Sequence, residues 1–277
     1  MRAINDSVDV SRLTTRSGDD VEMISKKPEK LTLESTNPIC QGNSTCEEFA
    51  VSIYPSIATI FVKNDSNNNQ FNYYCDGVLL SDRVIMTDAR CMMVSNKTLE
   101  PEDVLVFLGK ASLSTIGGDE KILRVKQIMV HENFTSEGEV KNDLALVVLD
   151  EPALLTQAVH EACLSDRNEG HVEHAATTAW SVTGDLVPII FNKEKSSTCY
   201  DKDSDIFCAT YANHVAFCPS YGGVYAAKKG GKWCVEGVFY GDPEDRGICF
   251  TKDVLYTSLN NYTAWIDEVV MINKIDL

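Results

Sequence analysis

Residues 75–91 read CDGVLLSDRVIMTDARC and give the strongest indication of the fold. A short apolar run within them, Val84–Met86, stands between clusters of turn-forming residues. Runs of the same kind recur at Ile57–Val62, Val104–Leu108 and Ile122–Val130. Short β-branched or aromatic runs separated by Gly, Asn, Asp and Ser are typical of an all-β sandwich or barrel. We therefore predict an all-β fold.

The two ends of the chain depart from this pattern. Up to about Pro38 the sequence is polar and has no cysteine or aromatic residue, so it cannot bury enough apolar surface to order itself. We expect a flexible arm at residues 1–39 and one domain at residues 40–277. Near the C-terminus, apolar residues recur at helical spacing and predict an amphipathic helix that packs on the barrel: Tyr262, Trp265, Ile266, Val269, Val270 and Ile272.

The composition excludes several classes of partner. The chain has 277 residues, and 41 acidic against 25 basic side chains give it a formal charge of −16. Such a charge opposes binding to nucleic acid phosphates and to anionic membrane surfaces. No stretch approaches the roughly 18 to 20 continuous apolar residues that a membrane-spanning helix needs. We expect no nucleic acid partner and no membrane contact.

The ten cysteines indicate the compartment. They include no C-x-x-C pair, which is a poor basis for a zinc site and suits a disulfide-stapled extracellular domain. The first 20 residues lack the apolar core of a signal peptide, so either one precedes this chain or the protein is not secreted. We follow the cysteines and expect secretion. Sequons at Asn5, Asn43, Asn64, Asn96, Asn133 and Asn261 agree, and the last five are our candidate glycosylation sites.

Several segments, read in order, resemble the trypsin and chymotrypsin family of serine proteases. Cys75-Asp-Gly-Val-Leu-Leu and Thr87-Asp-Ala-Arg-Cys91 resemble the C-G-G-S-L-I and T-A-A-H-C of that family. Asn142-Asp-Leu-Ala-Leu146 resembles N-D-I-A-L, and Trp233–Gly241 resembles W-x-x-x-G-x-x-x-W-G. Shorter matches occur at Val106–Gly109, Val130–Phe134, Cys163-Leu164, Ile206–Ala209, Leu255–Thr257 and Tyr262–Ile266. The resemblance covers roughly Cys46 to Ile272 and implies two packed six-stranded antiparallel β-barrels followed by a C-terminal α-helix.

The resemblance breaks at the catalytic residues. The family needs a serine nucleophile, a histidine that takes its proton and an aspartate that holds the histidine. Arg90 stands at the histidine position, and a guanidinium that stays protonated cannot act as a general base. Cys218–Gly223 stands for C-x-G-D-S-G-G and is one residue shorter, so the nucleophile position falls on Tyr221 or on Gly222, depending on the anchor. Ser220 is the only hydroxyl alternative, and no base is available to activate it.

Asp143 is the retained member of the triad. A buried carboxylate persists only when it is paired, and the geometry of the family implies Arg90 as its neighbour. We predict an Arg90 to Asp143 salt bridge. Pro219 falls at or beside a glycine whose N–H forms the oxyanion hole of the family, and proline has no N–H. The stretch before Tyr54 has no basic cleavage site followed by I-V-G-G, and Ser220 replaces the aspartate of the activation salt bridge.

The resemblance also implies an altered specificity pocket. Ala216 stands at its floor without a carboxylate, Phe239 and Tyr240 replace a serine and a tryptophan, and Gly241 remains. We expect Val254 to fill the pocket from a wall position that is glycine in the family. Tyr221 is either a plug in the vacated site or an exposed anchor for a partner, and we favour the plug.

We expect no metal and no cofactor. In the loop where the family may hold calcium, Lys110 and Gly117 replace two acidic ligands while Glu120 persists. His171 and His174 form an H-x-x-H pair without a third ligand on a polar loop. We interpret them as surface residues that bind no metal.

The resemblance implies three disulfides, Cys75 with Cys91, Cys199 with Cys208, and Cys218 with Cys249. Cys163 stands where the family ties its catalytic domain to the N-terminal segment, so Cys40 or Cys46 is its expected partner, and the other should pair with Cys234. We prefer Cys46 with Cys163 and Cys40 with Cys234. These two bridges would fix residues 40–46 as a strap across the back of the second barrel.

Two functions remain in competition. The first is a non-catalytic serine protease homologue that is secreted and binds extracellular proteins as a cofactor, decoy or scaffold. Inactive homologues of this kind occur in arthropod body fluids, in immune cascades, egg patterning and seminal fluid. The second is an active serine-type endopeptidase with rearranged catalytic residues. Because function resides in the site and not in the fold, the altered site favours the first.

Overall fold

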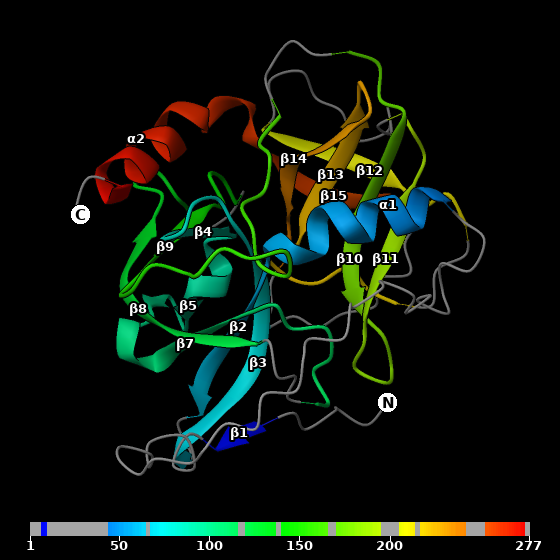
Figure 1. Cartoon of the computed structure of the whole chain (residues 1–277). Helices are drawn as coiled ribbons and strands as arrows, with labels where there is room; N and C mark the ends of the chain where they lie inside the picture. The colour runs from blue at the N-terminus through cyan, green and yellow to red at the C-terminus, as the bar shows by residue number, and fades with distance from the viewer. Residues whose placement is uncertain are drawn as a thin grey trace.

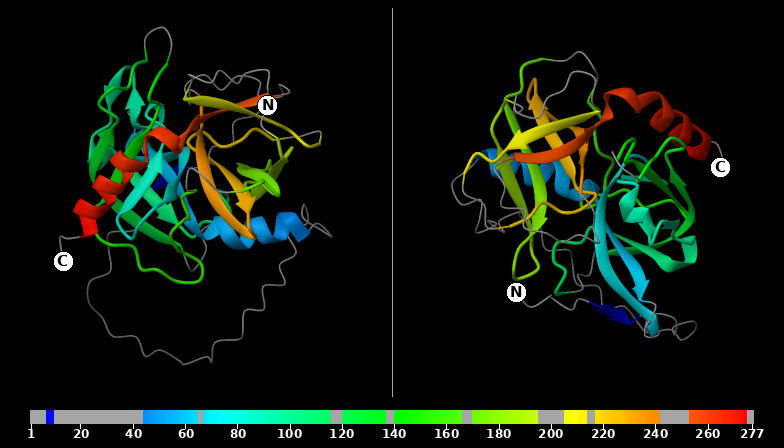
Figure 2. Two further views of the ribbon diagram at one scale, coloured as in Figure 1. Left: turned by 90° about the horizontal axis from the view of Figure 1, so that it is seen from above. Right: turned by 180° about the vertical axis from the view of Figure 1, so that it is seen from behind.

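The computed structural model describes residues 7–9, 44–64, 67–115, 120–136, 140–165, 170–194, 205–213, 217–241 and 253–274. Two β-units lie side by side, and a helix packs on each of them (Figures 1 and 2). The helices are α1 (Ser44–Ile53) and α2 (Thr263–Lys274), and the 3₁₀ turns are η2 (Tyr54–Ser56), η3 (Arg90–Met92), η4 (Pro101–Asp103) and η5 (Leu259–Asn261). The strands are β1 (Ser7–Asp9), β2 (Ile57–Asn64), β3 (Asn67–Leu79), β4 (Val84–Thr87), β5 (Met93–Val94), β6 (Lys97–Thr98), β7 (Val104–Leu108), β8 (Lys121–Val130), β9 (Ala145–Leu149), β10 (His174–Trp180), β11 (Leu186–Phe191), β12 (Ile206–Thr210), β13 (Val224–Lys229), β14 (Lys232–Phe239) and β15 (Asp253–Ser258).

Six strands close the first barrel. They pair antiparallel in the order β3-β2-β7-β8-β9-β4, and the pairing of Val78 with Met86 between β3 and β4 completes the circle. All five residues of β7 and all five of β9 are buried. Since neither face of these strands meets water, their sequences are continuous apolar runs and do not alternate.

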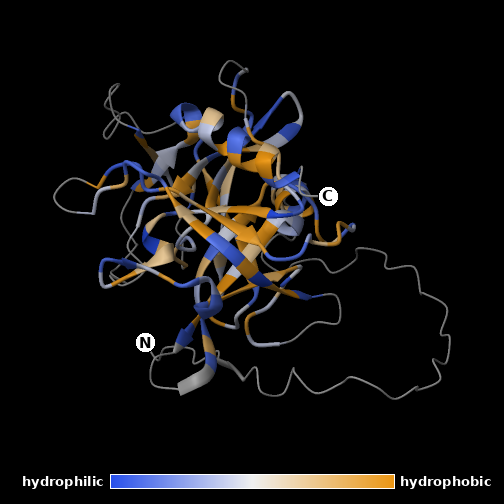
Figure 3. Cartoon of the chain, turned by 90° about the vertical axis from the view of Figure 1, so that its left-hand side faces the viewer, coloured by the Kyte–Doolittle hydropathy of each residue, from blue (hydrophilic) through white to orange (hydrophobic). Residues whose placement is uncertain are grey.

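The second unit is a six-stranded antiparallel sheet in the order β11-β10-β13-β14-β15-β12. Its two edges are joined by an isolated bridge between Phe191 and Tyr211, so it curls into a barrel without a continuous closing ladder. The apolar core runs from one unit into the other, because residues of both pack in one cluster with the two helices. Figure 3 shows this as orange strands inside a more hydrophilic periphery. The predicted fold class, two β-barrels and a C-terminal helix, is confirmed.

The two helices differ in how well the sequence predicts them. In α2, Ile266 and Val269 are buried in the core, as the helical spacing predicts. Helix α1 was not predicted. It lies on the second unit, where Cys46, Phe49 and Ile53 are buried and the ring of Phe49 meets that of Trp233 edge-on at 5.1 Å.

The expected flexible arm contains one strand. Ser7, Val8 and Asp9 form β1, which pairs antiparallel with Asn72, Phe71 and Gln70 of β3 and extends the first sheet at its edge (Figure 1). The arm therefore has at least one point of attachment to the domain, which its composition did not predict.

One disulfide prediction agrees with the structure and two are wrong. Cys75 and Cys91 are bonded to each other. Cys163 is bonded to Cys234, with 4.6 Å between their Cα atoms, so neither pairs with Cys40 or Cys46, and the predicted strap across the second barrel does not form.

The bond between Cys163 and Cys234 follows from the path of the segment that connects the two barrels. Leu164 forms a parallel bridge with Val235, and the Val235 N–H donates to the Cys163 carbonyl at 2.7 Å. The connection therefore runs along β14 and brings Cys163 beside Cys234. Cys46, Cys208 and Cys218 are also disulfide-bonded. The two remaining predictions pair Cys208 with Cys199 and Cys218 with Cys249, and they stay predictions because Cys199 and Cys249 lie outside the described residues, as does Cys40.

Within the part of the chain that the structure describes, neither helix is long and apolar enough to span a membrane.

Candidate functional site

The predicted ion pair is present where the two barrels face each other. Arg90 Nε donates to Asp143 Oδ2 at 2.8 Å, and Arg90 Nη2 lies 2.6 Å from the same oxygen. Asp143 Oδ1 accepts the backbone N–H groups of Ala89 and Arg90. Burial lowers the pKa of Arg90, but the charges of Asp143 and Asp88 outweigh this effect. The pKa of Arg90 therefore lies above its ordinary value. The carboxylate is thereby held by a permanent cation and two backbone donors.

A second buried aspartate, Asp88, stands behind this pair. It is 0% exposed, accepts the Cys91 N–H through Oδ1, and accepts the Gly222 N–H through Oδ2 at 3.2 Å. Burial raises the pKa of Asp88 well above its ordinary value, and the charge of Asp143 raises it further, while Arg90 and the two backbone donors oppose the rise. Asp88 therefore links the turn that carries Arg90 to the loop that carries Gly222.

The loop at residues 217–223 packs directly on the first barrel. The Asp76 N–H of β3 donates to the Tyr221 carbonyl at 2.7 Å. Gly222 has a φ of +68°, and a Cβ placed on it would lie 2.2 Å from the Asp76 carbonyl oxygen and 2.3 Å from Thr87 Oγ1. Only glycine fits this position, because both the left-handed backbone and the close approach exclude a side chain. A shortened loop thus fills the space between the barrels with backbone.

Three N–H groups of this loop are used inside the protein. Ser220 donates to the Thr178 carbonyl, Gly223 donates to the Ser220 carbonyl, and Gly222 donates to Asp88. Pro219 has no N–H and lies in an isolated bridge with Ala179 of β10. An oxyanion hole needs free N–H groups that converge on one point. These four residues supply none.

A third buried carboxyl, Asp76, lies beneath the loop. Trp180 Nε1 lies 3.2 Å from its Oδ1 and 3.0 Å from its Oδ2, and Thr87 Oγ1 donates to its carbonyl oxygen. Burial raises the pKa of Asp76 to about 7, and the neighbouring polar groups of Ser220, Trp180 and Tyr73 limit the rise. The protonated form of Asp76 is therefore favoured below neutral pH.

This raised pKa predicts a pH-dependent stability. In the unfolded chain Asp76 loses its proton near 3.8, whereas in the folded chain it does so near 7, so the folded state binds more protons between these values. The free energy of unfolding should then fall as the pH rises through this window, by about 1.4 kcal/mol per unit for one proton.

Urea unfolding at several pH values tests this. Asp76→Asn keeps the shape of the side chain but cannot bind the proton. Between pH 4 and 7 it should therefore reduce the slope of the free energy of unfolding against pH by the contribution of one proton. Asp150→Asn, at an exposed aspartate, should leave this slope unchanged. Equal slopes in wild type and Asp76→Asn would contradict the assignment.

Aromatic side chains fill the region of the predicted pocket. The rings of Tyr221 and Phe239 meet edge-on at 5.5 Å, and the Phe239 ring lies against Gly241, where an added Cβ would come within 2.3 Å of it. Tyr221 is partly buried against the core of the first barrel, as its interpretation as a plug requires. The Arg90 guanidinium lies 4.6 Å from the centre of the Tyr240 ring.

The remaining pocket positions are only partly described. Val254 is buried in the core of the second unit, in the same apolar cluster as Phe207 and Tyr256. Ala216, the expected floor, lies outside the described residues.

Lys110 provides a cation in the loop where the family may hold calcium. Its ammonium donates to the Thr115 carbonyl at 3.0 Å and to Glu120 Oε2 at 3.1 Å, and the two side chains are only 2% and 5% exposed. A buried ammonium that already binds a carboxylate and a carbonyl fills the role of an oxygen-ligated cation. Gly117 lies outside the described residues.

We expect Lys110→Met to lower the free energy of unfolding by about 2 kcal/mol, because the buried Glu120 carboxylate then loses the ammonium that it binds. The loop is near the surface, so Glu120 can turn toward water and the loss stays below that of a central pair. Thermal unfolding checks this, with Lys121→Met at an exposed position as the matched control. Addition of 5 mM calcium should leave the melting temperature of the wild type unchanged, and a rise of several degrees would contradict this account.

Three of the sequons lie at exposed positions of the structure. Asn96 and Asn133 are exposed in neighbouring turns, where Ser136 Oγ approaches Asn96 Oδ1 at 3.5 Å. Asn261 is also exposed. The side chain of Asn64 and all of Asn43 lie outside the described residues. Glycosylation stays a prediction.

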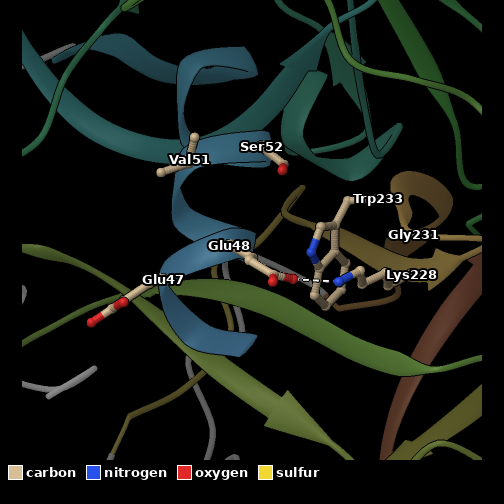
Figure 4. A pocket seen from close by; sticks show the side chains of 7 residues that line it. All are labelled: Glu47, Glu48, Val51, Ser52, Lys228, Gly231 and Trp233. Carbon is tan, nitrogen blue, oxygen red and sulfur yellow. Dashed lines mark hydrogen bonds and ion pairs between the residues drawn. The ribbon is translucent and has the colours of Figure 1, made fainter. Parts of the chain in front are cut away.

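A hollow of the described surface lies elsewhere, away from Arg90. It is lined by Glu47, Glu48, Val51 and Ser52 of α1 and by Lys228, Gly231 and Trp233 of the β13–β14 hairpin (Figure 4). None of these residues contributes to the cluster around Arg90. Among the described residues, His171 and His174 included, no group of three or more His, Cys, Asp or Glu is arranged to hold a metal ion.

The chain is similar to one known protein family and to known serine proteases. Residues 51–266 match the Trypsin family. The chain belongs to this family. It is 29% identical over 119 residues to Serine protease SSP1 of Scolopendra subspinipes, and 29% identical over 134 residues to Serine protease gd of Drosophila melanogaster. These matches span 43% and 46% of this chain but only 41% and 25% of the two relatives.

Sequence reasoning missed Asp76 and Asp88, although a signal was present. Both are departures inside the two motifs that carry the resemblance to the family, where C-G-G-S and T-A-A-H-C are replaced by Cys75-Asp-Gly-Val and Thr87-Asp-Ala-Arg-Cys91. A carboxylate in place of glycine or alanine on a buried strand or turn needs new donors. The loop at residues 217–223 and Trp180 supply them.

Proposed function

We propose that this chain is a catalytically inactive serine protease homologue that is secreted and acts by binding other extracellular proteins. Arg90 and Tyr221 take the places of the catalytic histidine and serine in this proposal. The chain then serves as a cofactor, decoy or scaffold in an extracellular pathway such as an immune cascade or seminal fluid.

The ion pair between Arg90 and Asp143 carries the proposal. The guanidinium occupies the carboxylate that would hold a histidine, and it has no lone pair with which to accept a proton from a nucleophile. The internal use of the N–H groups at Ser220, Gly222 and Gly223 supports the same conclusion, since a tetrahedral intermediate needs free donors. Base and oxyanion stabilisation would therefore both be lacking.

Secretion rests on the cysteines and sequons. Structural disulfides such as Cys75–Cys91 and Cys163–Cys234 persist in oxidising compartments. The exposed positions of Asn96, Asn133 and Asn261 are compatible with N-linked glycans.

Hydrolysis of casein and of a mixed pool of fluorogenic peptides tests the proposal. The purified protein should release product no faster than buffer, before and after limited proteolysis, while an active trypsin processed in the same way cleaves both. Turnover that is lost in Ser220→Ala would overturn the proposal and establish an active endopeptidase with rearranged residues.

A further inference from the structure

The outer edge of β3 is shared by three partners. On one side β3 pairs with β2 along most of its length. On the other side Gln70–Asn72 pair with β1, the Asp76 N–H binds the Tyr221 carbonyl, and Val78 and Leu79 pair with β4. The loop at 217–223 and β4 are integral parts of the domain. β1 is the only one of these partners that comes from outside it.

The pairing of β1 is short compared with the chain that leads to it. The strand has three residues, and 34 residues separate Asp9 from the start of α1 at Ser44. Three residues form few hydrogen bonds with β3, so little free energy holds the strand at this edge. A strand held in this way exchanges readily with another segment of the same conformation.

The edge has a defined chemical preference. Phe71, opposite Val8, is buried in an apolar cluster with Phe61, Leu105 and Phe107, and Tyr73 and Leu113 pack against it. Gln70 and Asn72 on either side are only partly buried. Cross-strand neighbours share a face, so a segment at this edge is favoured when an apolar residue stands opposite Phe71 with polar residues beside it. Ser7-Val8-Asp9 has this pattern in its own sequence.

We propose that Gln70–Asn72 of β3 form a docking edge for an extended segment of a partner protein, with the pattern polar, apolar, polar, which adds to the sheet in place of β1. An unpaired sheet edge is a general template for such strand addition. β1 then keeps the edge covered until a partner segment displaces it. This deepens the proposed function, on which it rests for the premise that the chain acts by binding proteins.

The test uses the full chain with two adjacent prolines, Ser7→Pro and Val8→Pro. Successive N–H groups of a strand point to opposite sides, so one of the two prolines removes a donor that faces β3. The matched control carries Thr14→Pro and Thr15→Pro, outside β1. The probe is a fluorescein-labelled peptide with the sequence of residues 4–12, and the measurements are hydrogen exchange of residues 70–72 and fluorescence anisotropy.

We expect exchange at residues 70–72 to be at least tenfold faster in the variant than in the wild type and the control. Added peptide should slow it again and bind the variant at least tenfold more tightly than the wild type. Unchanged exchange in the variant, or equal peptide binding by all three proteins, would overturn the docking edge. A wild-type dimer in which β1 pairs with the second copy would also overturn it. None of these outcomes bears on hydrolysis of casein, so the proposed inactivity stands or falls separately.

Discussion

Replacement of Arg90 by methionine is expected to lower the free energy of unfolding by about 3 to 5 kcal/mol at pH 7.5. Methionine keeps the apolar stem but leaves Asp143 without its cation, and removal of one partner from a buried ion pair typically costs this much. The loss is large here because Asp143 is 1% exposed, so water cannot take the place of the lost cation.

Urea unfolding measures this loss, with Arg83→Met as the control. Arg83 Nη1 donates to the Asp150 carbonyl at an exposed position, so its removal should cost less than 1 kcal/mol. The loss in Arg90→Met should also shrink toward pH 5. Burial raises the pKa of Asp143, so acid supplies a proton in place of the missing cation. The free energy of unfolding of Arg90→Lys should lie between those of the wild type and of Arg90→Met. An Arg90→Met protein as stable as the wild type would show that the pair is not structural.

The second large effect concerns an attempt to restore catalysis. We expect the double variant Arg90→His, Tyr221→Ser to hydrolyse peptide amides at least about 10⁴-fold more slowly than an active trypsin, as kcat/KM. With the nucleophile at 221, the second oxyanion donor belongs to position 219, where Pro219 has no N–H, and loss of one such donor costs about 10²- to 10³-fold. A further loss is expected because Asp88 binds the Gly222 N–H and holds the shortened loop in its present conformation beside the new serine. New triad residues do not recreate the missing donor.

The matched control keeps Arg90→His and Tyr221→Ser and adds one substitution in the loop at residues 217–223. A triple variant that adds Pro219→Gly supplies the missing backbone N–H and should exceed the double variant in rate. A double variant within about 10²-fold of trypsin would contradict the view that the loop itself prevents catalysis.

The fold and the Arg90 to Asp143 pair were predictable because both follow from motifs in order along the chain. Thr87–Cys91 and Asn142–Leu146 fix where Arg90 and Asp143 fall in a double-barrel fold, and a buried carboxylate then requires the adjacent cation. The aromatic filling around Phe239 and Tyr221 follows from bulky residues at positions that are smaller in active members.

Features that depend on long-range pairing were not predictable in this way. The bond between Cys163 and Cys234 depends on the parallel path of the barrel connection along β14, which no local pattern reports. The hydrogen bond from Gly222 to Asp88 joins residues 134 apart in sequence.

Helix α1, in contrast, had a local signal in the sequence that we did not use. Ser44 and Glu47 have the spacing of a capping box, and Cys46, Phe49 and Ile53 lie on one face.

The central claim is that no residue of this site acts as an activated serine nucleophile. The most direct measurement is the intact mass of the purified wild-type protein after incubation with a fluorophosphonate probe, before and after limited proteolysis. The account predicts an unmodified mass under both conditions, with an active trypsin fully labelled in parallel. One probe per chain on the wild type, absent from Ser220→Ala, would contradict it.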